Sequence, residues 1–244
     1  MVPSLKEVLM RYEFSKSFCH RVLTMLLFCG LVAANAQPTG LLYDPEPPAD
    51  SAYVRVVNAA PKGVVDVRVD GRSRIQKLGT GEASEYMVIS AGKHTIALHA
   101  LGKQEAQLTT TLDVVQGRAT TVAFTTLRGD SVPVVFEDKA NTNKLKALLS
   151  VYHLADKAEP LDVLTVDGKT KVFSNVTYGT SVSIPVNPIS IELIAVKVGE
   201  KTPQARTSLA MSQGGTYSVL LLPSDGGKLI AQSVQNKIER YTGK

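Results

Sequence analysis

The feature that most constrains the fold of this chain is a segment that occurs twice. VVDVRVDG (64–71) in the first half corresponds to LDVLTVDG (161–168) in the second, and both segments end in an Asp-Gly pair. Each reads as a short β-strand with alternating side chains that runs into a tight turn. A strand and turn repeated at this distance predict two copies of a domain of ~100 residues, the size of a β-sandwich.

Further segments repeat in the same order and at nearly the same spacing. The pairs are KLGT (77–80) with TYGT (177–180), HTIAL (94–98) with ISIEL (189–193), TTVAF (120–124) with YSVLL (217–221), and FEDK (136–139) with VQNK (234–237). An internal duplication explains this order, with roughly seven strands in each copy.

Alternating hydrophobicity identifies the strands of the first copy. The pattern is clear at 52–58, 64–70, 93–100 and 118–127, and turn residues such as Asp70-Gly71 separate these segments. The residues after 36 contain no long amphipathic helical pattern. We therefore predict an all-β fold of two tandem antiparallel β-sandwich domains that arose by internal duplication.

Composition places the domain boundaries. Pro45, Pro47 and Pro48 favour an extended leader over 37–51. The first sandwich is expected at 52–137 and the second at 147–235. The polar stretch at 138–146 is expected to be a linker, and 236–244 a C-terminal tail.

The first 36 residues have the order of a secretory signal peptide. Lys16 and Arg21 precede an apolar run, Val22 to Val32, and Ala34-Asn35-Ala36 follows it. We expect cleavage after Ala36 and a periplasmic location, with the residues before Ser15 as an N-terminal extension. The apolar run is shorter than the ~20 residues of a membrane-spanning helix, so no span is expected in the mature chain.

Cysteine and charge narrow the classes of protein further. Both cysteines, Cys19 and Cys29, lie in the predicted signal peptide, so the mature chain must rely on its apolar core rather than on disulfides. The net charge of the full chain is +5, spread along the sequence. Nucleic-acid binders concentrate their basic residues, so no nucleic-acid partner is expected.

The sequence contains no local pattern of a catalytic, metal or cofactor site. Gly129-Asp130-Ser131 matches the nucleophile block of SGNH hydrolases and acetyltransferases, but the Asp-x-x-His block that completes their site is missing, and a turn explains the segment. His94 and His99 have a spacing that places them on opposite faces of a strand, and His153 belongs to the other copy. We predict no enzyme, no metal and no cofactor. Only residues that converge in the fold could overturn this prediction.

One basic group is a candidate contact surface. Arg68, Arg72, Arg74 and Lys77 surround a single predicted hairpin. They are candidates to bind an anionic polysaccharide or a protein partner. The structural alternative is a solvated hairpin whose charges protect an edge strand from aggregation.

The leader and first strand resemble the AlgF family of alginate O-acetylation accessory proteins. The resemblance rests on LLYDPEPPADSAYVRVVNAA (41–60), in which Tyr53 to Ala59 match the family's first strand. NKLKALLSVYHLAD (143–156) occupies the place of the linker and of the strand that opens the second domain. LLSVYHL (148–154) stands there where an arginine-containing strand would be expected.

The resemblance implies a non-catalytic periplasmic adaptor required for O-acetylation of an exported polysaccharide, either alginate or cellulose. Its implied partners are periplasmic SGNH-type acetyltransferases and a membrane-bound O-acyltransferase. The alternative function is a module that binds the polysaccharide itself, which the group from Arg68 to Lys77 suggests.

Overall fold

The computed structural model describes residues 46–60, 63–126, 133–224 and 226–242, and every regular element in these ranges is a β-strand. All strands belong to one compact unit, Asp44–Lys244. The predicted signal peptide and the Gly129-Asp130-Ser131 block lie outside the described residues. Among the described residues, no helix reaches the length and hydropathy that a membrane crossing requires.

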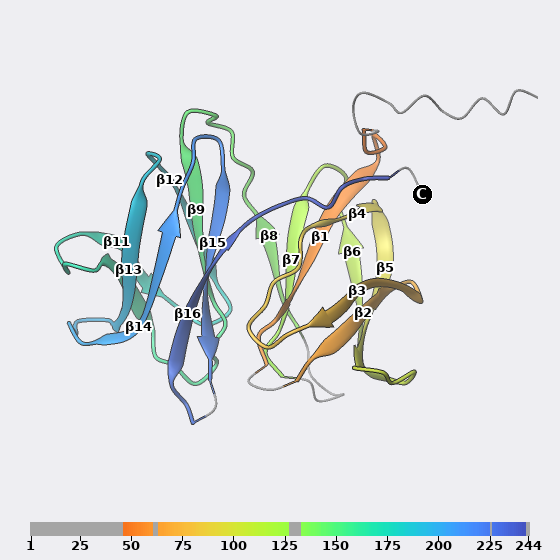
Figure 1. The fold of residues 1–244 in the computed structure, drawn as a ribbon, viewed down its shortest axis with the longest axis horizontal. Coiled ribbons are helices and arrows are strands. Elements are labelled where there is room, and N and C mark those ends of the chain that lie inside the picture. Colours follow the sequence, from red (N-terminus) through yellow and green to blue (C-terminus); the bar gives the residue numbers. More distant parts are fainter. Residues whose placement is uncertain (1–45, 61–62, 127–132, 225, 243–244) are drawn as a thin grey trace, which may run out of the picture. The chain divides into compact units, whose positions relative to one another are not determined.

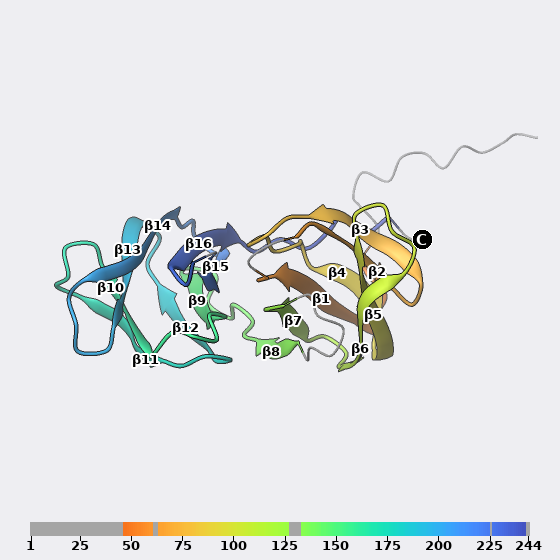
Figure 2. The same ribbon diagram turned by 90° about the horizontal axis from the view of Figure 1, so that it is seen from below.

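Eight strands form the first sandwich (Figure 1). They are β1 (Ser51–Asn58), β2 (Val65–Val69), β3 (Arg72–Leu78), β4 (Met87–Ser90), β5 (Gly92–Ala100), β6 (Ala106–Val114), β7 (Ala119–Phe124) and β8 (Val134–Asp138). One sheet has the order β4-β1-β7-β8 and is called the β1 sheet below. The other has the order β3-β2-β5-β6 and is called the β2 sheet (Figure 2).

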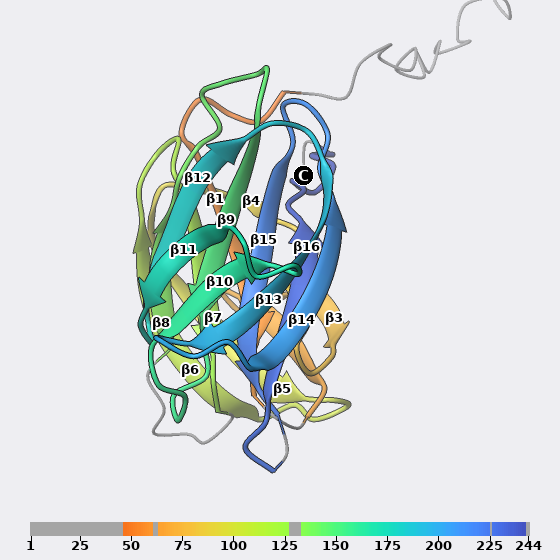
Figure 3. The same ribbon diagram turned by 90° about the vertical axis from the view of Figure 1, so that its left-hand side faces the viewer.

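Eight further strands form the second sandwich. They are β9 (Ala147–His153), β10 (Leu161–Thr165), β11 (Lys171–Val176), β12 (Ser181–Val186), β13 (Ser190–Lys197), β14 (Pro203–Ala210), β15 (Thr216–Pro223) and β16 (Leu229–Gln235). The β9 sheet has the order β12-β9-β15-β16, and the β10 sheet has the order β11-β10-β13-β14 (Figure 3). Each strand order is that of the first sandwich with every strand number raised by eight, which confirms the duplication.

The predicted all-β double sandwich is thus confirmed, with two details that the sequence did not indicate. Each copy has eight strands rather than about seven. Within each copy, one central pair is parallel: β1 runs parallel to β7, and β9 to β15. The other pairs between named strands of the described residues are antiparallel. β1 and β7 are neighbours in a sheet but are not joined by a hairpin, and the same holds for β9 and β15. The chain between them passes through the other sheet, so the two strands can run in the same direction.

The turn predicted at Asp70-Gly71 is also confirmed. Both residues have positive φ, 51° and 77°, and they connect β2 to β3. Two successive residues in the left-handed region are typical of a type I′ hairpin turn, in which glycine avoids the steric cost that a β-carbon would bring.

Three apolar clusters hold these strands together. One fills the space between the β1 and β2 sheets, and another fills the space between the β9 and β10 sheets. The third joins the outer faces of the β1 and β9 sheets, and we call it the junction. Its buried members are Val57, Ala59, Ala123, Phe136, Tyr152, Leu154, Leu220 and Leu222.

The residues after β16 return to the first sandwich (Figure 1). The main-chain N–H of Tyr86 donates to the carbonyl oxygen of Lys237 (2.8 Å), and the N–H of Glu239 donates to the carbonyl oxygen of Tyr86 (2.9 Å). The carboxylate of Glu239 accepts from the N–H of Val88 (2.8 Å). Residues 236–239, expected in a tail, therefore form a C-terminal strap beside β4.

Candidate functional site

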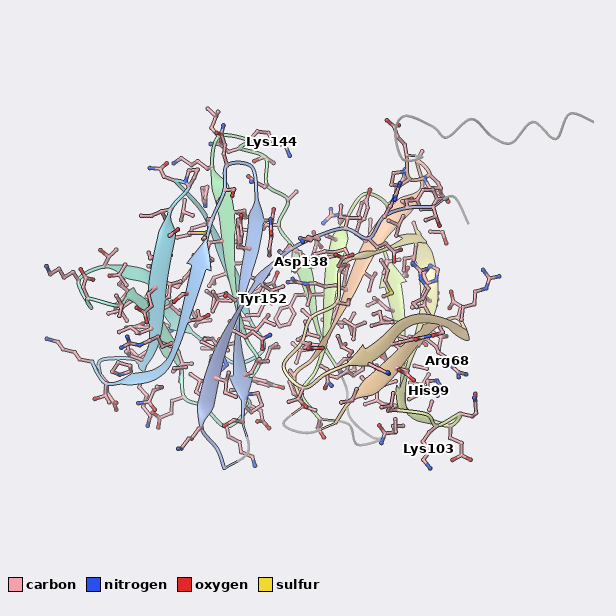
Figure 4. All side chains as sticks on the ribbon, viewed as in Figure 1. Arg68, His99, Lys103, Asp138, Lys144 and Tyr152 are labelled. Atoms are coloured by element: carbon pink, nitrogen blue, oxygen red, sulfur yellow. The ribbon has the colours of Figure 1, made fainter. Side chains whose placement is uncertain are left out.

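The four basic residues predicted as a contact surface do not gather in one patch. Arg68 lies on β2 between the core residues Val67 and Val69, so its side chain leaves the opposite face, where it donates to Gln104 (2.9 Å). Figure 4 shows Arg68 near His99 and Lys103. Lys77 is exposed in β3, and its main-chain N–H donates to the Asp66 carboxylate (2.9 Å).

Arg72 and Arg74 are the two members that the structure brings together. Both line a cavity of about 510 Å³ beside β4, together with His94 and Tyr241. Arg74 forms an ion pair with Glu239 of the strap and also donates to the Val88 carbonyl oxygen (3.4 Å). Its charge is therefore already matched within the chain.

The three histidines of the described chain occupy separate environments. His94 lies 2.6 Å from the Asp70 carboxylate and 2.9 Å from the Ser90 carbonyl oxygen. His99 and His153 are buried, and the Nδ1 atom of each has no hydrogen-bond partner in the structure. Burial lowers the pKa of His153. Within the described ranges, no three His, Cys, Asp or Glu residues are placed to share a metal ion.

The most extensive buried polar cluster lies at the junction and centres on Arg55 of β1. Val54 and Val56 face the core of the first sandwich, so Arg55 points to the other face of the sheet, where it is completely buried (0% exposed). A buried guanidinium is stable only when its donors find acceptors. Arg55 has acceptors in both copies.

Three hydroxyl or amide oxygens accept hydrogen bonds from Arg55. Nε donates to Thr121 of the first sandwich (2.8 Å). The two terminal nitrogens donate to Asn236 (2.7 Å) and to Ser218 (2.9 Å), which belong to the strap and to the second sandwich. The guanidinium also lies 4.9 Å from the ring centroid of Tyr86 and 5.1 Å from that of Tyr152. Two aromatic faces at this range add cation–π attraction.

Asp138, the last residue of β8, accepts hydrogen bonds from three hydroxyl groups around Arg55. Tyr152 donates to it from the second sandwich (2.6 Å), and Tyr86 (2.8 Å) and Thr121 (2.6 Å) donate from the first. Figure 4 shows Asp138 and Tyr152 close together at the junction. The segment expected to begin the linker therefore contributes the carboxylate that both copies share.

Burial keeps the two phenols protonated. Burial and, after it, the nearby Asp138 carboxylate raise the pKa of Tyr152 to about 12, against the opposing effect of Arg55. Burial also strongly raises the pKa of Tyr86, again with Arg55 opposing. Each phenol is consequently a hydrogen-bond donor to Asp138 at neutral pH.

The two copies contribute equivalent groups to this cluster. Thr121 on β7 lies opposite Arg55, and Ser218 on β15 lies opposite Ser150. Thr121 donates to Asp138 (2.6 Å), and Ser218 donates to Asn236 (2.8 Å). Position 55 thus corresponds to 150, and position 138 to 236. The second copy has Ser and Asn where the first has Arg and Asp.

A cleft of about 640 Å³ opens beside the cluster, and we call it the junction cleft. Tyr53, Ala119 and Asp138 line it from the first copy, Ser150 and Tyr152 from the second, and Ile238 from the strap. This volume is within the range of ligand sites. The hydroxyls of the cluster are engaged with Asp138 or Arg55, so the arrangement supports binding and positioning rather than nucleophilic attack.

Sequence reasoning did not identify the residues of the cluster. Arg55 was noted only as part of a strand that resembles a known family, and Asp138 and Asn236 were assigned to a linker and a tail. One signal was present: the pairing of FEDK (136–139) with VQNK (234–237) aligns Asp138 with Asn236.

The comparisons with known proteins agree with the predicted resemblance. The family described as a domain of unknown function (DUF4397) matches residues 52–164, from β1 into β10. The alginate biosynthesis protein AlgF of Pseudomonas putida is 27% identical over 210 residues, which cover 84% of this chain and 90% of that protein. AlgF of Pseudomonas aeruginosa is 26% identical over 220 residues, which cover 89% and 94%. The solved C-terminal domain of P. aeruginosa AlgF is 26% identical, with a TM-score of 0.32, and covers 38% of this chain and 100% of that domain.

Proposed function

We propose, from the premise that this chain is a relative of the AlgF proteins, that it is a non-catalytic accessory protein in the biosynthesis of an exported polysaccharide. Its role is to organise O-acetylation of the polymer. Its partners are periplasmic SGNH-type acetyltransferases and a membrane-bound O-acyltransferase. The polymer is alginate, after the name of the relatives, with cellulose as the alternative. The chain acts in the periplasm once its signal peptide has been removed.

The observation that carries this proposal is that Arg55 binds side chains of both copies. Its contacts with Thr121 and Ser218 join the first sandwich to the second through a fully buried group. An adaptor that holds two enzymes at once benefits from surfaces that are already fixed relative to each other, because less ordering entropy is lost on binding. A preorganised double sandwich provides such surfaces.

Deletion and complementation test the proposal. We expect removal of the gene from a producing strain to abolish O-acetyl esters on the polymer while polymer yield stays near normal. The full chain should restore the esters. Variants that replace Ser131, His94, His99 or His153 by Ala should also restore them. Ester content per sugar is measured by colorimetric assay or NMR.

Two outcomes contradict the proposal. Unchanged acetylation in the deletion strain removes the role in acetylation. Loss of acetylation in a folded Ser131 or histidine variant indicates catalysis by the chain itself. A pull-down of the tagged full chain from membranes then checks for the two acyltransferase classes, and we expect both in the eluate.

A second candidate function is binding of the polymer by the chain alone. The observation that favours it is the cavity that contains both Arg72 and Arg74. We expect weak binding of acidic oligosaccharides there, because Glu239 already neutralises Arg74. Calorimetric titration with oligouronates decides the question, and absence of heat with the wild-type chain eliminates this function.

A further inference from the structure

The junction cleft owes its open space to the difference between the two copies. On the first copy's side, the long side chain of Arg55 fills the junction and is completely buried. The corresponding residue of the second copy, Ser150, is short, and its hydroxyl lies 2.8 Å from that of Ser183 on the neighbouring strand. Ser150 lines the cleft, so a space remains where a second arginine side chain would lie.

Four polar side chains that line the cleft are already engaged by the protein. Tyr86 and Tyr152 donate their hydroxyl protons to Asp138. The side-chain oxygen of Asn236 accepts from Arg55 and Ser218. The amide nitrogen of Asn141 is within 3.0–3.3 Å of three carbonyl oxygens. A sugar, which carries several hydroxyl groups, would find few vacant partners here.

Part of the remaining lining is apolar. It includes the half-buried Tyr53, Ala119, Ala140 and Ile238 of the strap, which is 56% exposed. Large apolar or aromatic side chains that enter such pockets are the usual anchors of protein interfaces. The lining thus favours a protein side chain over a sugar.

The rim of the cleft is basic. Lys139 and Lys237 are exposed lining residues, and neither forms an ion pair with another described residue. Arg118, the third cation of the rim, is paired with Glu137. Two exposed lysines beside an apolar pocket attract acidic residues that flank the anchor.

We propose that the junction cleft is a docking site for a protein segment in which an aromatic or large apolar side chain is flanked by Asp or Glu. The anchor enters between Tyr53 and Ile238, and its acidic neighbours contact Lys139 and Lys237. This inference rests on the proposed adaptor function and assigns it a surface and a kind of partner.

Fluorescence anisotropy with labelled peptides tests the proposal on the full mature chain. The probes are an acidic peptide with a central Phe (DEDFDED), the same peptide with Ala in place of Phe, and a basic peptide with the same Phe. We expect binding of the first probe only. The double variant Lys139→Glu/Lys237→Glu should weaken binding by at least about tenfold, since like charges then face each other. Tyr53→Ala should also weaken it.

A matched control carries the same charge change elsewhere. Lys93→Glu/Lys103→Glu alters two exposed lysines of the first sandwich outside the cleft and should bind the peptide as wild type does. Circular dichroism confirms that each variant is folded.

Three results overturn the inference. They are no binding of DEDFDED by the wild-type chain, equal weakening by the control variant, and displacement of the peptide by alginate oligomers that themselves bind in the cleft. These results do not depend on the ester content of the deletion strain. Failure of the docking site can therefore be distinguished from failure of the adaptor function.

Discussion

The two copies of the sandwich differ most at the surface where they meet. In the first copy, β1 carries Arg55 and β8 carries Asp138, on either side of β7 in the sheet that faces the junction. In the second, the corresponding positions carry Ser150 and Asn236, which are neutral. Both copies keep the hydroxyl next to these positions, Thr121 in one and Ser218 in the other.

This difference shows how a duplicated domain can bind its own copy. Two buried guanidinium groups facing each other would repel strongly in a medium of low dielectric constant. A single arginine avoids the repulsion and can be shared by the acceptors of both copies. The second copy lacks both members of the charged pair, the arginine and the carboxylate.

A second comparison concerns a part of the fold that the copies share. Asp66 accepts from the N–H of Lys77, and Asp162 accepts from the N–H of Asn175 (2.9 and 2.8 Å). The two residues that donate these bonds, Lys77 and Asn175, have positive φ, 57° and 50°. Both lie where the strand register shifts. The duplication has therefore kept a local backbone irregularity together with the carboxylate that holds it.

Removal of Arg55 tests the comparison most severely. Arg55→Ala removes a donor from Thr121, Ser218 and Asn236, of which Asn236 keeps only Ser218, and we expect the free energy of unfolding to fall by about 3–5 kcal/mol. Thermal unfolding followed by calorimetry should change from one transition to two. Arg206→Ala, which removes an exposed ion pair with Glu192, should cost less than about 1 kcal/mol. Equal losses in the two variants would show that the junction contributes little.

Alkaline pH is expected to have the next largest effect on the junction. The phenol of Tyr152 has a pKa of about 12 in the folded chain, whereas in the unfolded chain it ionises near pH 10. The unfolded state therefore binds fewer protons above pH 10, and stability falls as pH rises. From pH 10 to 12, Tyr152 accounts for a loss of roughly 2 kcal/mol. Urea unfolding across this range measures the slope, and Tyr152→Phe should reduce it. An unchanged slope in that variant contradicts the assignment.

Exchange of the carboxylate between the copies sharpens the comparison. Asp138→Asn gives the first copy the side chain of the second and removes the negative charge beside Arg55, at an expected cost of about 1–3 kcal/mol. Adding Asn236→Asp returns the charge from the other copy and should recover part of that loss. A double-mutant cycle in urea reports the coupling. Strictly additive effects would mean that positions 138 and 236 do not share Arg55.

The smallest expected effect concerns the shared backbone irregularity. Lysine is disfavoured at positive φ, whereas asparagine tolerates it. Lys77→Gly should therefore stabilise the chain by about 0.5–1 kcal/mol, and Asn175→Gly should change it by less. Unfolding midpoints of the two variants measured side by side check this order, and the reverse order would refute it.

The fold was predictable from the sequence because each copy repeats local signals. The alternation in 64–70 and the Asp70-Gly71 turn specify a strand and a hairpin with few neighbours involved. Strand partners were not predictable in the same way, because alternation fixes which side chains share a face but not which strand lies beside another. The parallel pairing of β1 with β7 is an example.

The repeat alignment itself shows this limit. HTIAL (94–98) aligned with ISIEL (189–193) sets Leu98 against Leu193. In the structure, Asp66 and Asp162 hold equivalent bulges, so Val67 corresponds to Val163, one residue away from the alignment of 64–71 with 161–168. Leu98 pairs with Val67 and Ala195 with Val163, so Leu98 corresponds to Ala195. A shift of two residues preserves the face of every side chain in a strand, so hydrophobicity cannot detect it.

The junction was the least predictable part. Arg55 meets Ser218 at a separation of 163 residues and Asn236 at a separation of 181. A polar residue in a polar stretch, such as Asp138 in EDKANTNKLK, gives no local sign that it will be buried between two domains. The group from Arg68 to Lys77 stood out in the sequence because its charges lie close together along the chain. In the structure, only Arg72 and Arg74 of this group line the same cavity.

The strap makes the junction sensitive to a cut far along the chain from Arg55. Asn236, 181 residues away, accepts one of the hydrogen bonds of this buried arginine. A protease that removed the strap would leave a guanidinium donor without its acceptor between the two sandwiches. Loss of a few residues after β16 would therefore weaken the junction from within.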